Sequence, residues 1–154
     1  MRMADCQARA SQKALAVQSY ELAATIAAQT KQANLESIAD VNEAGLQAEA
    51  GKLGKALQLY QHALQLDDSN GERTSSAEDW LAYGRFLDNE GFPARLVYAC
   101  LVKSGSLEDA ISDASQRKFL ADARKKAEGR LGAEASAIRR DPEPVLKEAL
   151  AVRR

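Results

Sequence analysis

Residues 41–66 read VNEAGLQAEAGKLGKALQLYQHALQL, and this stretch decides the fold. Apolar and small residues recur every three to four positions on both sides of the glycine-bearing segment 50–55. Such spacing is typical of amphipathic helices, and glycine between two periodic runs marks a turn. The stretch therefore predicts a helix, a turn and a second helix.

Residues 80–103 repeat this order of elements. They begin with WLAYGRFL at 80–87, continue with the turn sequence NEGFP at 89–93, and end with Leu96, Cys100 and Lys103 at helical spacing. A shift of 39 residues places Val41, Ala44, Gly45 and Ala48 on Trp80, Tyr83, Gly84 and Leu87. A shift of 40 places Ala16, Tyr20 and Ala23 on Ala56, Tyr60 and Ala63. The chain therefore contains an internal repeat with a period near forty residues.

The repeated residues resemble those of the tetratricopeptide repeat (TPR) family, in a variant with a period longer than the usual ~34 residues. That family carries W-x-x-L-G-x-x-Y on its first helix and a small–aromatic–small triplet on its second. The matching residues are Trp80, Gly84 and Leu87 for the first helix, and Ala56, Tyr60 and Ala63 for the second. The resemblance implies antiparallel helical hairpins stacked as a right-handed α-solenoid, whose concave groove binds a peptide or helix of a partner protein.

The flanking segments complete the expected domain. No turn signal interrupts residues 4–30, which predicts one long N-terminal helix, and the polar segment 67–76 predicts an extended loop. We expect TPR-like repeats over residues 1–105 and capping helices of the same domain over residues 106–154. Ser106 or Ser112 would cap a helix that runs to about Arg130 and is closed by Gly132.

A short last helix is expected after the sequence DPEP at 141–144. Asp141 suits its N-cap, and proline is tolerated in the first turn of a helix. Val145, Leu146, Ala149 and Leu150 would form its buried side.

The composition agrees with an all-α fold and excludes several kinds of function. Of the 154 residues, 30 are alanine and only 5% are aromatic, which favours helices over a sheet. The formal net charge of −1 gives no overall nucleic-acid footprint. One histidine and two cysteines, Cys6 and Cys100, without a CxxC motif do not supply a zinc site.

No cofactor, signal sequence or transmembrane segment is expected from the sequence. The charged residues Arg9, Lys13 and Glu21 interrupt the N-terminal region, and no window holds the ~18–20 apolar residues of a membrane helix. Two isolated cysteines fit a reducing compartment, so we expect a cytoplasmic protein, or an exported or periplasmic one if a signal sequence has been removed. A Cys6–Cys100 disulfide would require that the fold bring the two together.

The candidate catalytic groups favour a structural reading, so we expect a protein that is not an enzyme. A Cys100–His62 pair lacks the third group that would orient the base. Asp67-Asp68 and Glu78-Asp79 stand where carboxylates are ordinary helix-end or first-turn residues. GKLGK at 51–55 lacks the spacing and the Ser/Thr of a phosphate-binding loop.

The leading function hypothesis is a non-catalytic interaction scaffold that binds a protein or peptide partner in the groove. The resemblance implies that first-helix side chains between the packing positions line this groove. In this chain the candidate residues are Asn42, Leu46, Glu49, Leu81, Arg85, Asp88 and Asn89.

Two alternative interactions remain open. A basic face on the helix at 117–130 would bind nucleic acid or an anionic surface through Arg117, Lys118, Arg124, Lys125 and Arg130. An uncovered apolar face on the N-terminal helix, near Tyr20 and Ile26, would instead produce a homodimer.

Overall fold

The computed structural model describes the backbone of residues 2–153 and the side chains of residues 11–153. Within this part of the chain the regular elements are eight α-helices and one short 3-10 helix, with no strand, so the all-α prediction is confirmed. The chain divides into two compact units, Met1–Asn70 and Gly71–Arg153, each described by itself below. The side chain of Cys6 lies outside the described residues.

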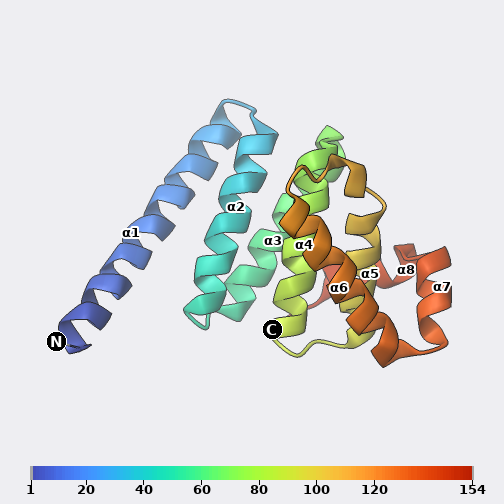
Figure 1. Cartoon of the computed structure of the whole chain (residues 1–154). Coiled ribbons are helices and arrows are strands. Elements are labelled where there is room, and N and C mark those ends of the chain that lie inside the picture. Colours follow the sequence, from blue (N-terminus) through green and yellow to red (C-terminus); the bar gives the residue numbers. More distant parts are fainter. Residues whose placement is uncertain (1, 154) are drawn as a thin grey trace. The chain divides into compact units, whose positions relative to one another are not determined.

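The first unit contains α1 (Arg2–Gln29), α2 (Ala33–Glu49) and α3 (Leu53–Asn70). The single helix α1 confirms the long N-terminal helix predicted over residues 4–30. Figure 1 shows α1 and α2 lying side by side, and α2 also packs against α3. The turn between α2 and α3 has Gly51 at a φ of +75°, a conformation that glycine adopts without steric cost.

Small residues let α2 and α3 approach each other. Ala44 on α2 and Ala56 and Ala63 on α3 are completely buried. A Cβ atom added at Gly45 would lie 3.9 Å from the hydroxyl oxygen of Tyr60. The hairpin predicted from residues 41–66 is therefore present, with an aromatic side chain opposite a small residue.

The extended loop predicted over residues 67–76 is wrong. Helix α3 continues to Asn70 and α4 begins at Arg73, so only Gly71 and Glu72 join them. The polar residues Asp, Ser and Asn have weak helix propensity, but they extend an existing helix without a new nucleation step. Helix α3 ends where Gly71 adopts a φ of +70°.

The second unit begins with the hairpin of α4 (Arg73–Asn89) and α5 (Ala94–Gly105). A Cβ atom at Gly84 would lie 3.2 Å from Leu101 Cδ2 and 3.3 Å from Cys100 Cβ. The absence of a side chain at Gly84 therefore sets how closely α4 and α5 pack. This agrees with the role that the repeat pattern gave to its small residues.

After α5, the short 3-10 helix η1 (Glu108–Ala110) leads to α6 (Ala114–Leu131), which packs against α5. The predicted caps Ser106 and Ser112 are wrong, because Asp113 is the N-cap. Its carboxylate accepts a hydrogen bond from Ser115 N at 2.7 Å. Gly132, with a φ of +56°, closes the helix as predicted.

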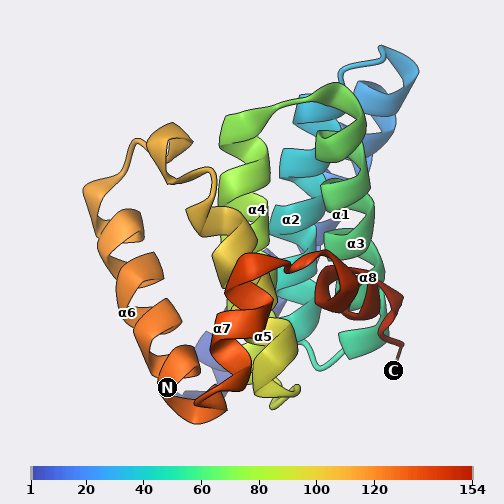
Figure 2. The same cartoon turned by 90° about the vertical axis from the view of Figure 1, so that its right-hand side faces the viewer.

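Two short helices complete this unit, α7 (Glu134–Arg140) and α8 (Glu143–Ala151), and Figure 2 shows both beside α5. Helix α7 is not anticipated by the sequence pattern. The N-cap of α8 is Pro142 rather than Asp141, whose carboxylate accepts a hydrogen bond from Glu143 N at 3.3 Å. Leu146 and Ala149 are buried as expected, whereas Val145 and Leu150, expected on the same side, are only half-buried.

Buried hydrogen bonds connect the helices of this unit. The hydroxyl of Tyr83 on α4 donates to the carbonyl oxygen of Ala149 on α8 at 2.6 Å. The hydroxyl of Ser104 on α5 donates to the carbonyl oxygen of Ala77 on α4 at 2.7 Å. Each bond satisfies a polar group that would otherwise lower stability by about 1–3 kcal/mol.

Candidate functional site

One line of exposed and half-buried residues runs along α2, and we call it the α2 stripe. Its members follow each other at intervals of three to four residues, which places them on one side of the helix. They are Leu35, Ile38, Asn42, Leu46 and Glu49. The stripe contains three of the groove residues predicted from the sequence, and it extends them by two apolar residues that the sequence analysis missed.

The two added residues are the most apolar part of the stripe. Leu35 is 48% exposed and Ile38 is 46% exposed, one turn apart on α2. The amide of Asn42 donates a hydrogen bond to the carbonyl oxygen of Ile38 at 2.8 Å. The stripe therefore presents two large apolar side chains next to an amide group.

A hollow of about 530 Å³ lies between α1 and α2 at the other end of the stripe. Its apolar lining includes Ala14, Val17 and Leu46. At its edge, Lys13 forms an ion pair with Glu49 at 2.5 Å. The predicted groove residues Leu46 and Glu49 therefore both belong to this hollow.

The predicted groove residues of α4 are placed differently. Leu81 is buried, whereas Asn89 is exposed. The guanidinium of Arg85 lies 4.6 Å from the ring centre of Phe119 on α6. Asp88 forms ion pairs with Lys126 at 3.3 Å and with Arg130 at 2.8 Å.

Side chains of α6 therefore contact Arg85 and Asp88, two of the α4 residues that the sequence analysis assigned to a partner. A hollow of about 260 Å³ lined by Leu81, Arg85 and Phe119 stays open between the two helices. Burial alone would raise the pKa of Asp88, but the hydrogen bonds and charges of Arg130 and Lys126 hold it below its ordinary value. The carboxylate therefore stays charged and keeps these contacts at neutral pH. Between α4 and α6 a smaller pocket of about 110 Å³ remains.

The same contacts use part of the predicted basic face of α6. Arg130 is paired with Asp88, and Arg117 donates hydrogen bonds to the carbonyl oxygens of Ile111 and Ser112. Arg124 is partly buried and lies against Gly105. The exposed members of the predicted face are Lys118, Lys125 and Arg130, the last of them paired with Asp88.

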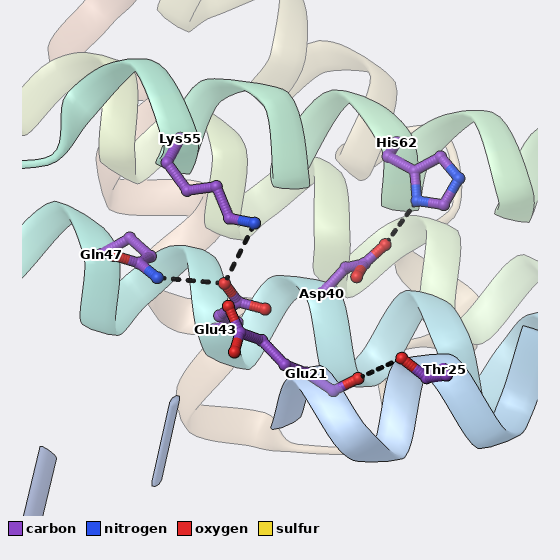
Figure 3. A network of polar contacts seen from close by, with 7 residues as sticks. All are labelled: Glu21, Thr25, Asp40, Glu43, Gln47, Lys55 and His62. Atoms are coloured by element: carbon purple, nitrogen blue, oxygen red, sulfur yellow. Dashed lines mark hydrogen bonds and ion pairs between the residues drawn. The ribbon is translucent and has the colours of Figure 1, made fainter. Parts of the chain in front are cut away.

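Figure 3 shows a polar network between α2 and α3. Glu43 is buried; its carboxylate accepts a hydrogen bond from Gln47 Nε2 at 3.0 Å and lies 3.6 Å from Lys55 Nζ. One turn away, His62 Nδ1 lies 2.6 Å from Asp40 Oδ2. These contacts join polar side chains across the hairpin and fix the register of α3 on α2.

We expect Asp40→Asn to change the pH dependence of stability in the acid range. Burial raises the pKa of the Asp40 carboxyl above its ordinary value of 3.8, although His62 partly opposes this. The folded chain therefore holds this proton more tightly than the unfolded chain. Binding of this proton stabilises the folded chain fully at pH values below the ordinary pKa of Asp40, and this stabilisation is lost as the pH rises through the raised pKa.

The uncharged asparagine removes this loss and keeps an acceptor oxygen for His62. The free energy of unfolding of Asp40→Asn relative to wild type should therefore increase as the pH rises from about 3 to about 6. Urea denaturation at several pH values measures this difference. If the free energies of unfolding of the two proteins changed with pH in parallel, burial would not be what raises the pKa of the Asp40 carboxyl.

Cys100 and His62 do not have the surroundings of a catalytic pair. Cys100 is a free thiol with no exposed surface, and burial raises its pKa, so it stays protonated. His62 is half-exposed and lies beside the carboxylates of Asp40 and Glu36. The structural reading of both residues therefore holds.

Neither metal binding nor membrane spanning finds support in the described residues. Among them no group of three or more His, Cys, Asp or Glu side chains is arranged to hold a metal ion. No helix in this part of the chain is long and apolar enough to cross a bilayer. Comparison with known proteins identifies no relative: no family model, no curated protein and no solved structure matches the chain.

Proposed function

We propose that this protein is a non-catalytic protein–protein interaction scaffold of the TPR-like α-solenoid class. The proposal is supported by the two helical hairpins, α2–α3 and α4–α5, whose packing residues follow the repeat pattern. The groove function comes from fold-level analogy, which is a weak argument by itself. A specific surface is therefore needed to support it.

The α2 stripe supplies this surface, and the exposure of Leu35 and Ile38 is the observation that carries the proposal. A helix surface in water is ordinarily polar, and adjacent large apolar side chains on it mark binding sites. Desolvated apolar anchors provide most of the affinity at protein interfaces. We propose that a helix or extended peptide of the partner lies along α2 and covers these two side chains.

The remaining residues of the stripe indicate the chemistry of the partner. The hollow beside Leu46 accepts a further apolar side chain, while Lys13, Glu21, Glu49 and Lys52 place both signs of charge around it. A strongly charged partner therefore gains no overall attraction here. An amphipathic segment with two or three apolar anchors and a mixed polar face fits best.

We expect Ile38→Glu to weaken partner binding at least tenfold, about 1.4 kcal/mol, because it places a charge where the partner's apolar side chain packs. The full chain would be immobilised and exposed to lysate of the source organism, and a retained protein would be purified. Its affinity for wild type and for Ile38→Glu would then be measured by titration calorimetry.

Leu22→Glu on α1 is the matched control, since Leu22 is an exposed large apolar residue outside the α2 stripe. The control should bind the partner as wild type does. A partner that binds Ile38→Glu and wild type equally would remove the α2 stripe from the interaction. Equal melting temperatures of the three proteins would exclude a folding defect.

A further inference from the structure

A second apolar surface lies on α1, formed by Leu15, Ser19, Leu22 and Ile26, which we call the α1 stripe. The three apolar members are 60%, 61% and 51% exposed, respectively. Val17, Tyr20, Ala24 and Ala27 are the less exposed residues of the helix, and α1 packs on α2. At 3.6 residues per turn, the α1 stripe is on the opposite side of the helix from this set.

The sequence around the stripe is almost without charge. Between Lys13 and Lys31 the one charged residue is Glu21. Glu21 lines the hollow beside α2 and is directed toward Glu43 in Figure 3, so it is not part of the stripe. A helix face that remained in water would instead carry charged and polar residues.

The internal repeat shows what this face of a helix does elsewhere in the chain. A shift of 40 residues places Leu15 and Leu22 on Lys55 and His62 of α3. Both of these residues contact α2, at 3.6 Å from Glu43 and 2.6 Å from Asp40. These two residues of α3 therefore reach α2 through their polar ends and stay about half exposed, whereas the corresponding residues of α1 are exposed and apolar.

We infer that the α1 stripe binds α1 of a second copy of the chain, in antiparallel orientation. The four residues are four, three and four positions apart, a spacing that reads the same in both directions. An antiparallel copy therefore places Leu15 opposite the partner's Ile26. It also places the small Ser19 opposite the partner's Leu22, so that a large side chain fills the space over a small one.

Charge selects the antiparallel orientation over the parallel one. A parallel copy in register places Lys13 beside the partner's Lys13 and Glu21 beside the partner's Glu21. The antiparallel copy separates the two Lys13 residues and opposes the two helix dipoles, whereas the two Glu21 residues stay within one residue of the same level. It places Lys13 at the level of the partner's Ala28.

The dimensions indicate a weak dimer. Helix α1 has 28 residues and α2 has 17, so at 1.5 Å per residue α1 is longer by about 16 Å. In the register that places Leu15 opposite the partner's Ile26, residues 12–29 of the two helices overlap over about 27 Å. A helix face about 10 Å wide then buries about 540 Å² in total, which is the range of the weakest interfaces. We therefore expect a monomer–dimer equilibrium near the millimolar range.

Sedimentation equilibrium of the full chain tests the dimer. Wild type should change from a mass near 16.7 kDa to about twice this value as its concentration rises. Leu22→Glu should raise the dissociation constant at least tenfold, because it places a carboxylate against the partner's Ser19 and between two apolar contacts. Ile38→Glu, on the α2 stripe, is the control that should dimerise as wild type does.

Paired cysteines test the orientation, in a Cys6→Ser background; Cys100 is buried and needs no replacement. Chains carrying both Leu15→Cys and Ile26→Cys should form a covalent dimer under mild oxidation, whereas Leu15→Cys alone should not. Within one helix these two sites are about 16 Å apart, too far for an internal disulfide. Efficient cross-linking of Leu15→Cys alone would show a parallel pair and overturn the proposed register.

The two proposals fail independently, because this inference does not rest on the proposed function. A wild-type chain that stays monomeric at high concentration overturns the second-copy inference but leaves partner binding at α2 untouched. If that monomer also retained another protein that Leu22→Glu lost, the α1 stripe would belong to a different partner. Circular dichroism of Leu22→Glu confirms that the helices remain folded.

Discussion

Gly84→Leu should destabilise the second unit by about 3 kcal/mol. The first atom of the new side chain would lie 3.2 Å from Leu101 Cδ2 and 3.3 Å from Cys100 Cβ. Leu101 and Cys100 are themselves buried, so they have no free space into which to move. Helices α4 and α5 would have to separate, which exposes apolar surface on both.

Urea denaturation followed by the fluorescence of Trp80, the single tryptophan of the chain, measures this loss within the same unit. Gly129→Leu on α6 is the matched control, because a Cβ atom there meets nothing within 4 Å. In that open position leucine should stabilise the helix by about 0.5–1 kcal/mol through its higher helix propensity. If Gly84→Leu and Gly129→Leu changed the free energy of unfolding by a similar amount, the close approach of α4 and α5 would not be what makes Gly84 sensitive to substitution.

Gly84 also illustrates what the sequence predicts well. Helices and their packing faces follow from local periodicity in the sequence. The glycine-bearing turn and the small residues of 41–66 therefore locate the first hairpin, and those of 80–87 locate the second. Ala56 and Ala63 are completely buried on α3, which packs against α2. The pattern of small residues therefore predicts close helix contacts without knowledge of the neighbouring chain segments.

The segment 67–76 shows where local reasoning fails. Aspartate, serine and asparagine favour turns by intrinsic preference, but the structure extends α3 through them to Asn70. A helix that is already formed adds residues at little further cost, so weak propensity does not fix its end. The positive φ of Gly71 marks the end instead.

The candidate site was predictable only in part, for a related reason. Asn42, Leu46 and Glu49 lie on an accessible line of α2, but Leu35 and Ile38 in the same line were not recognised as exposed. On α4, Arg85 and Asp88 contact α6, which follows them by more than thirty residues. Exposure thus depends on contacts between distant segments, and a local repeat pattern does not contain them.

Leu120→Ala should lower the free energy of unfolding by about 3 kcal/mol, whereas Phe119→Ala should lower it by only about 1 kcal/mol. The two residues are adjacent large apolar side chains on α6. Leu120 has no exposed surface, so its truncation leaves a cavity in a packed interior. Phe119 is 41% exposed, and its ring contacts the guanidinium of Arg85 from the surface.

The two variants separate the effect of burial from that of side-chain size, because truncation of the larger side chain, Phe119, is expected to give the smaller loss in the free energy of unfolding. Both variants would be measured by urea denaturation at Trp80, with equal slopes required so that the midpoints report stability. A loss for Phe119→Ala as large as that for Leu120→Ala would mean that the ring is part of the core. Apolar packing at Phe119 would then stabilise the contact between α6 and α4 in addition to the ion pairs of Asp88.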